Sequence, residues 1–194
     1  MQHGELIFVD LEASSLNEGY PIEVGWTIVR DFQVTTESHL IRPTTKWYFD
    51  DYRWSMESQA VHRITRGNLL DFGKPPIEVA TQMTDLFAGK ILYSDAPRYD
   101  FAWTVELYRA AFTDFQAMPF SFADVSILYK DSNTDERKFE REIRKRRKFK
   151  VEHRASEDAL NLALIWCHTR RGIDASQFQF PPMLESWKIL LDNQ

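Results

Sequence analysis

The strongest constraint on the fold is a short apolar run near the amino terminus that ends in two carboxylates. The segment Leu6-Ile-Phe-Val9 is followed by Asp10, Leu11 and Glu12. Because successive side chains of a strand point to opposite faces, Asp10 and Glu12 would share one face at the end of a buried strand. Two like charges held this close repel each other, and a divalent cation bound by oxygen ligands would compensate them. The alternative is an ordinary solvated strand end.

The size and composition favour one compact domain over residues 1–194. Of the 194 residues, 43% are hydrophobic and 27% are charged, which allows a sizeable core. The single cysteine, Cys167, cannot form an internal disulfide; it favours a reducing, cytoplasmic setting and is expected to be a buried apolar side chain. No apolar run approaches the roughly 20 residues of a membrane span, and the first residues do not resemble a signal peptide. We therefore expect no membrane association.

The formal net charge of -5 hides an uneven distribution. Between Arg137 and Lys150 there are nine Lys or Arg against two Glu, a local net charge of +7, so the rest of the chain is strongly acidic. A basic segment on an acidic body could track the phosphates of a nucleic acid while the acidic residues bind metal. It could equally be the solvated face of a charge-rich helix.

The residue pattern predicts strands that alternate with helices. After the first strand, segments rich in β-formers are expected as strands at 22–29, 32–41, 91–94 and 122–125. Helical spacing of apolar residues is found between Pro75 and Gly89, over 101–112 and over 155–171. This order, three strands followed by alternating helices and strands, indicates an α/β fold.

A second acidic group lies where the strand at 91–94 gives way to a helix. Ligands bind at strand ends in open α/β sheets, so Asp100 would project from the first helical turn toward Asp10 and Glu12. Asp95 is a competing candidate. Either aspartate could instead cap the helix.

A third group, His153 and Asp158, lies just before and inside the first turn of the last helix. Together with the earlier acids it makes four carboxylates and a histidine supplied by three elements. Two divalent ions held by such a set can activate a water molecule and stabilise the leaving oxygen of an in-line displacement at phosphorus. His153 is a candidate general base, since the unperturbed histidine pKa of about 6.5 lies near working pH.

The ordered motifs resemble those of a known family, the DEDDh 3′–5′ exonucleases, which include bacterial proofreading subunits and ribonuclease T. The resemblance covers roughly residues 5–171. Three catalytic motifs and three secondary segments carry it: Val9-Asp-Leu-Glu12, Arg98-Tyr-Asp100, His153-Arg-Ala-Ser-Glu-Asp158, Pro21-Ile-Glu-Val-Gly25, Val61-His-Arg-Ile-Thr65 and Ser121-Phe-Ala-Asp124.

This resemblance implies a ribonuclease H-like α/β fold, a mixed five-stranded sheet flanked by α-helices, with residues 172–194 as a C-terminal extension. It implies that Asp10, Glu12, Asp100 and Asp158 bind two Mg²⁺ or Mn²⁺ ions and that His153 deprotonates the attacking water. The activity would be hydrolysis of terminal phosphodiester bonds in single-stranded or frayed RNA or DNA with a free 3′ end, releasing nucleoside 5′-monophosphates. Relatives of similar length often form homodimers. The alternative is a non-catalytic nucleic-acid-binding module on the same fold.

The chain also departs from the family pattern. Ala13-Ser14-Ser15 stands where many members have Thr-Thr-Gly or Thr-Ala-Gly, and Asp95 stands near the place of a usual Asn. Substrate contacts are expected from the residues at or near the motifs, namely Leu11, Ser14, Ser15, Tyr99 and Arg147. His62 is expected to be a packing or hydrogen-bonding residue. The aromatic residues between Trp47 and Trp54 could stack on unpaired bases or form a packed loop over the sheet.

Overall fold

The fold was analysed in a computed structural model, which describes residues 4–114, 117–130, 134–148 and 154–181. The described strands are β1 (Leu6–Ala13), β2 (Pro21–Arg30), β3 (Gln33–Leu40), β4 (Ile91–Ser94) and β5 (Ser121–Asp124). The described α-helices are α1 (Thr45–Tyr48), α2 (Met56–His62), α3 (Arg66–Phe72), α4 (Pro76–Phe87), α5 (Pro97–Ala111), α6 (Glu136–Lys148) and α7 (Ala155–Thr169). Short 3₁₀ helices are η1 (Asp51–Arg53), η2 (Val125–Tyr129) and η3 (Ala175–Gln177).

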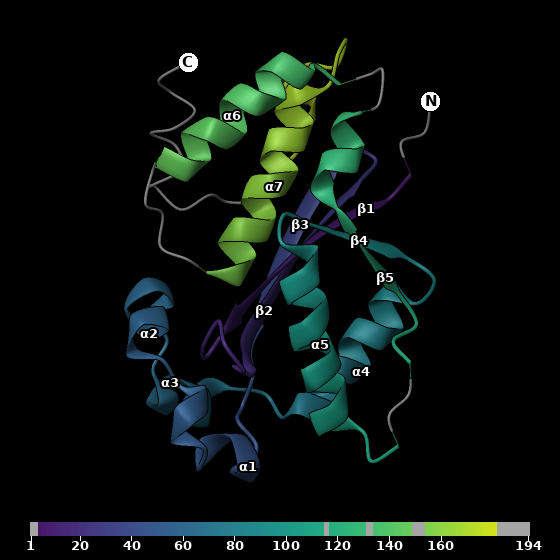
Figure 1. Cartoon of the computed structure of the whole chain (residues 1–194). Helices are drawn as coiled ribbons and strands as arrows, with labels where there is room; N and C mark the ends of the chain where they lie inside the picture. Colours follow the sequence, from purple (N-terminus) through teal and green to yellow (C-terminus); the bar gives the residue numbers. More distant parts are fainter. Residues whose placement is uncertain (1–3, 115–116, 131–133, 149–153, 182–194) are drawn as a thin grey trace.

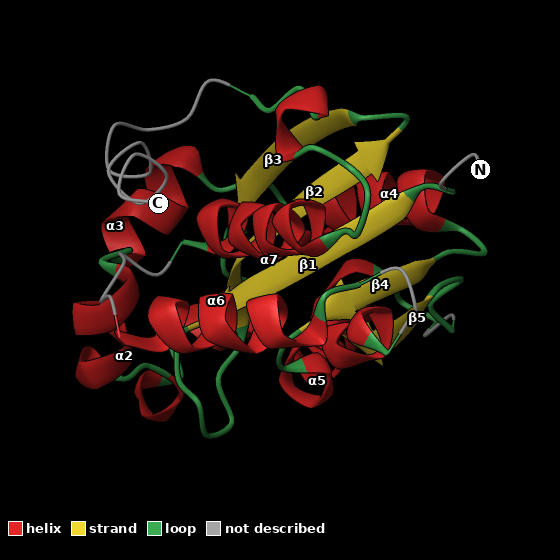
Figure 2. Cartoon of the chain, turned by 90° about the horizontal axis from the view of Figure 1, so that it is seen from above, coloured by secondary structure: helices red, strands yellow, loops and turns green. Residues whose placement is uncertain are grey.

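The five described strands form one sheet in the order β3, β2, β1, β4, β5 (Figure 2). The pairs β1 with β2 and β2 with β3 are antiparallel, whereas β4 runs parallel to both β1 and β5. The sheet is therefore mixed, as predicted. The central strand β1 pairs with β2 along its whole length but with β4 only at Ile7 and Phe8, so its carboxyl end extends past β4.

Residues of β1 alternate between two layers of helices. Ile7 and Val9 belong to the core shared with α4 and α5, whereas Phe8 belongs to the core shared with α7. Figure 1 shows α7 along the sheet with α6 beside it. The period of two then places Asp10 and Glu12 on the α7 side. The apolar run thus fixes the face on which the carboxylates emerge.

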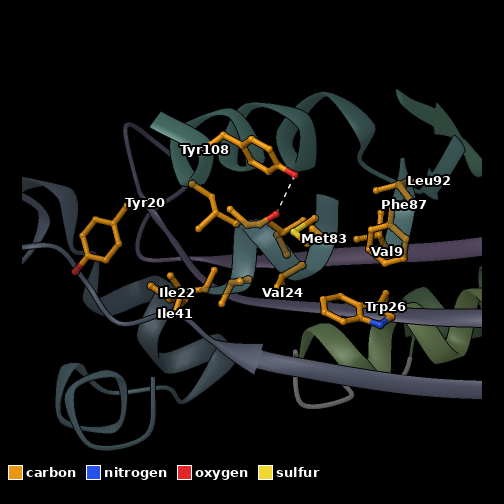
Figure 3. Packing of buried hydrophobic residues seen from close by; sticks show 14 of the residues in the cluster. Val9, Tyr20, Ile22, Val24, Trp26, Ile41, Met83, Phe87, Leu92 and Tyr108 are labelled. Carbon is orange, nitrogen blue, oxygen red and sulfur yellow. Dashed lines mark hydrogen bonds between the residues drawn. The ribbon is translucent and has the colours of Figure 1, made fainter. Parts of the chain in front are cut away.

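The core on the other face is closely packed with aromatic rings. Trp26 meets Phe87 of α4 edge to face, with ring centroids 5.4 Å apart. The hydroxyl of Tyr108 on α5 donates a hydrogen bond of 3.2 Å to the carbonyl oxygen of Ala80 (Figure 3). These contacts join α4 to the sheet and the carboxyl-terminal part of α5 to α4.

The segment between β3 and α4 differs from its prediction. It forms the short α-helices α1, α2 and α3, gathered at one end of the sheet (Figure 1), and the 3₁₀ helix η1. Trp47 is 3% exposed and packs in the core, while Phe49 and Tyr52 are 77% and 98% exposed. Only part of the aromatic cluster is thus free to stack on a ligand.

Other differences are small. Helix α5 begins at Pro97 rather than 101, because proline is well suited to the first helical position. Helix α7 ends at Thr169 rather than 171. Among the described residues, no helix has both the length and the apolar character that crossing a bilayer demands. The extent of the domain stays a prediction, and residues 182–194 of the C-terminal extension lie outside the described ranges.

Gly25 of β2 lets the first residues of α7 approach the sheet. A Cβ atom added there would lie 2.2 Å from backbone atoms of Ala155 and Ser156. We predict that Gly25→Ala lowers the free energy of unfolding by about 1–3 kcal/mol, because backbone atoms would have to move. Urea denaturation would measure this.

The matched control is Gly67→Ala in α3, where the nearest atom, the Thr65 Oγ, lies 3.6 Å away. This change should be neutral or should stabilise the protein by about 0.5–1 kcal/mol, because alanine favours helix. Equal unfolding free energies for the two variants would contradict the close packing of α7 on β2.

Candidate metal and active site

Three predicted acids converge at the end of β1. Asp10 and Glu12 come from the strand, and Asp158 comes from the first turn of α7. Each offers a carboxylate oxygen, and these oxygens all lie within 4.8 Å of one another. Asp158 is 8% exposed. The cluster therefore joins two elements that are more than 140 residues apart in sequence.

The fourth acid, Asp100, borders the same strand from the first turn of α5. It is 1% exposed, and its carboxylate accepts a hydrogen bond of 3.1 Å from the backbone N–H of Leu11 and another from the Ser94 hydroxyl. Asp95, the competing candidate, is exposed. The buried aspartate that touches β1 is thus Asp100.

Burial and mutual repulsion disfavour the charged forms of these acids. Burial is the main cause that raises the pKa of Asp10 well above its usual value, followed by the charges of Asp100 and Asp158. Burial, followed by the charge of Asp158, raises the pKa of Glu12 from 4.5 to about 8. Burial raises the pKa of Asp100 from 3.8 to about 7, although its hydrogen bond from Ser94 lowers it. Such shifts are typical of functional sites.

The donor set fits a hard divalent cation. Its oxygens are all carboxylate oxygens, which Mg²⁺ and Mn²⁺ prefer over the nitrogen and sulfur ligands of softer metals. The clustered negative charge is also what a cation would compensate. Asp10, Glu12 and Asp158 are therefore candidate ligands of one ion, with Asp100 next to them.

An ion pair between buried Glu23 and partly exposed Arg154 lies beside the cluster, and neither residue was predicted to have a role. Glu23 of β2 is 0% exposed and lies directly opposite Glu12 in the register of the two strands. Its carboxylate accepts hydrogen bonds from the side chain of Arg154 and from the backbone N–H of Ala155. One signal was available in the sequence: a glutamate between apolar residues of an otherwise buried strand.

The predicted substrate residues have different surroundings. The Leu11 side chain packs in the core, and its N–H is bonded to Asp100. Ser14 is 0% exposed, and its hydroxyl donates to the Arg53 carbonyl and accepts from the Tyr20 N–H. Ser15 is half-buried, and Tyr99 is 51% exposed and leans on Trp103. Of these four residues, only Ser15 and Tyr99 have side chains exposed to solvent.

For two predicted site residues the structure describes either nothing or only the backbone. His153 is outside the described residues, and Arg147 belongs to α6 but its side chain is not among those described. His62 is buried, and its Nδ1 accepts a hydrogen bond of 3.0 Å from the N–H of Ile64. This is the packing and hydrogen-bonding role that was expected for it.

This chain is similar to known proteins in its structure. No family model matches the chain, and no curated protein sequence matches it. Solved structures of exonuclease I do match. The chain shares the exonuclease I fold. This confirms the predicted ribonuclease H-like α/β architecture.

Three of these exonuclease I structures illustrate the likeness. An apo structure superposes with a TM-score of 0.61 at 18% identity over 87% of this chain and 43% of that one. Another exonuclease I structure, which suggests how processivity is achieved, superposes with a TM-score of 0.61 at 16% identity over 87% of this chain and 41% of that one. A zinc-bound complex of the E. coli enzyme with single-stranded DNA superposes with a TM-score of 0.59 at 18% identity over 83% of this chain and 39% of that one. The chain thus spans about two fifths of the length of these exonuclease I chains.

The raised pKa of Glu12 generates a prediction for the protein without metal. A carboxyl whose pKa is higher in the folded state stabilises the fold below its unfolded pKa of 4.5, and this contribution is lost as pH rises toward about 8. The free energy of unfolding of the wild type, relative to Glu12→Gln, should therefore fall between pH 5 and pH 8. Urea denaturation in chelator at several pH values would measure it.

The exposed carboxylate of Glu78 on α4 provides the control for removing one acid, through Glu78→Gln. Adding Mn²⁺ at pH 8 should restore stability to the wild type more than to Glu12→Gln, because bound cation offsets the repulsion. If the free energy of unfolding varied with pH in the same way for the wild type and Glu12→Gln, ionisation of Glu12 would not destabilise the fold.

Proposed function

We propose that the protein is a metal-dependent 3′–5′ exonuclease that acts on single-stranded or frayed nucleic acid. The observation that supports this most is the convergence of Asp10, Glu12 and Asp158 within 4.8 Å at the end of β1, with buried Asp100 beside them. Binding alone gives no reason to collect repelling acids. The shared fold of exonuclease I, which has been solved with single-stranded DNA, supports the same substrate class.

In this proposal the four acids hold two Mg²⁺ or Mn²⁺ ions. When bound, such ions supply Lewis-acid stabilisation of charge on phosphate oxygens and lower the pKa of water. Asp100 is kept in place for this role by its hydrogen bonds from Leu11 and Ser94. Asp158 is kept in place by the start of α7.

The proposed general base is His153, which precedes α7 in the sequence. It would take a proton from the water that attacks the terminal phosphorus. The bond between that phosphorus and the O3′ of the preceding nucleotide then breaks. The products are a nucleoside 5′-monophosphate and a strand shortened by one residue with a new 3′-hydroxyl.

The basic helix α6 is proposed to guide the phosphates of the strand. It packs beside α7, the helix that carries Asp158 (Figure 1). Its sequence holds most of the basic residues between Arg137 and Lys150, including Arg147. Phosphate contacts of this kind raise affinity for any sequence and weaken with salt. Ser15 and Tyr99 are proposed contacts for the terminal nucleotide because they retain exposed surface.

The activity itself can be tested with end-labelled single strands. With Mg²⁺ or Mn²⁺ the protein should release mononucleotides from the 3′ end, and chelator should stop the release. Asp158→Asn should lower the rate by at least about 10²-fold because a metal ligand is lost, whereas Asp85→Asn, an exposed change on α4, should not. Matched RNA and DNA oligonucleotides in one buffer would reveal which sugar is preferred.

If binding occurs without any metal-dependent release, the protein is instead a non-catalytic nucleic-acid-binding module on the same fold. Release from 5′-labelled strands that are blocked at the 3′ end would contradict the proposed polarity.

The assigned roles differ between the base and the ligands. His153→Ala should leave Mn²⁺ binding intact and still reduce turnover by roughly 10²-fold or more, because a general base is lost. Asp10→Ala should abolish both metal binding and turnover. Calorimetric titration with Mn²⁺, run beside the nuclease assay, would separate the two effects. Equal losses of Mn²⁺ affinity in both variants would contradict the assignment.

A further inference from the structure

Glu23 is a buried carboxylate that faces the candidate metal site yet is engaged elsewhere. It is 0% exposed and lies between Ile22 and Val24 on β2, directly across the strand pair from Glu12. A buried charge is costly unless it is paired and hydrogen-bonded. Here the compensation comes from the segment that begins α7.

The contacts of Glu23 satisfy both of its oxygens. Arg154 donates from Nε at 3.0 Å and from Nη2 at 2.7 Å, and the backbone N–H of Ala155 donates at 3.0 Å. An arginine fork that binds a carboxylate through two nitrogens has little freedom to rotate. Glu23 therefore fixes the direction in which the chain enters α7.

The helix depends on this contact at its first turn. Arg154 is the N-cap residue, but its own side chain makes no capping hydrogen bond. The Glu23 carboxylate instead accepts from the first helical N–H, where a negative charge is also favoured by the helix dipole. Gly25, two residues along β2, leaves the space into which the backbone of Ala155 and Ser156 fits.

The same turn carries the candidate ligand. The backbone N–H of Asp158 donates to the carbonyl oxygen of Arg154 at 2.9 Å. The position of Asp158 beside Asp10 is thus linked through one helical turn to Arg154, and through the ion pair to β2.

We propose that Glu23 and Arg154 are a positioning pair that places Asp158 in the metal-binding cluster. In this proposal Glu23 acts through Arg154 and Ala155, to which both of its oxygens are hydrogen-bonded, and not as a metal ligand. The effect on turnover rests on the proposed function, whereas the effect on metal binding needs only the carboxylate cluster. Residues that orient metal ligands in this way typically change metal affinity by 10–100-fold when removed.

The test measures Mn²⁺ affinity by calorimetry for the wild type, Glu23→Ala, Arg154→Ala and the double variant. Each single change should weaken Mn²⁺ binding about 10-fold, and the double variant should be no weaker than either single one, because the two residues act as a unit. Glu23→Gln retains an acceptor for the Ala155 N–H and should recover part of the affinity. In the nuclease assay, kcat should fall while KM for the oligonucleotide changes less than about 2-fold.

The matched control is Glu5→Ala at the opposite end of β1. Glu5 also joins two cations, Arg30 and Lys90, and its side chain is 11% exposed. Its removal should leave Mn²⁺ affinity unchanged. Urea denaturation of each variant shows whether it is folded. If Glu23→Ala does not fold, Glu23→Gln and Arg154→Lys carry the same comparison.

The outcomes separate this inference from the proposed function. A wild type that binds Mn²⁺, together with folded Glu23 and Arg154 variants that bind it equally well, would overturn the positioning role alone. Losses of affinity that add up in the double variant would also overturn it. A wild type that binds no Mn²⁺ would overturn the proposed function itself.

Discussion

Repulsion among the carboxylates that meet at the end of β1 is the constraint on which the rest of the site depends. Asp10, Glu12 and Asp158 lie together, and burial raises the pKa of the first two. Arg154 lowers the pKa of Glu12, but its guanidinium is bonded to Glu23. The positive charge of Arg154 is therefore balanced by Glu23 and does not cancel the negative charge of the cluster. An arrangement that costs stability in this way persists where function requires it.

The scaffold overcomes this repulsion by holding the four acids on three elements, β1, α5 and α7. The alternation along β1 sets the face of Asp10 and Glu12, since Ile7 and Val9 are held in the opposite core. Asp100 is tied to the strand through the Leu11 N–H, and the first turn of α7 rests on β2 at Gly25. Strand β1 supplies only two of the four carboxylates, so the others join them only because α5 and α7 pack against the sheet.

Local patterns predicted the parts of this arrangement that depend on local physics. Strand alternation placed Asp10 and Glu12 on one face, and the strand-to-helix junction placed Asp100 in a first helical turn. The helices between β3 and α4 were missed, since they are short and depend on capping by Thr44, Ser55 and Thr65 more than on apolar spacing. The partner of Glu23 was missed because it lies 131 residues away. Periodicity carries no information about such distant pairs.

The loop after β1 shows how this chain can depart from the family pattern and keep its geometry. Ser14 stands where many members of the family that this chain resembles have threonine or alanine, and here it is buried and bonded to the Arg53 carbonyl and the Tyr20 N–H. The Ser55 N–H in turn donates to the Ser14 carbonyl. The loop is therefore fixed by hydrogen bonds to the segment that exposes Tyr52, although Ser15 stands where the family has glycine. A loop already held in this way would lose less conformational entropy when a ligand binds next to it.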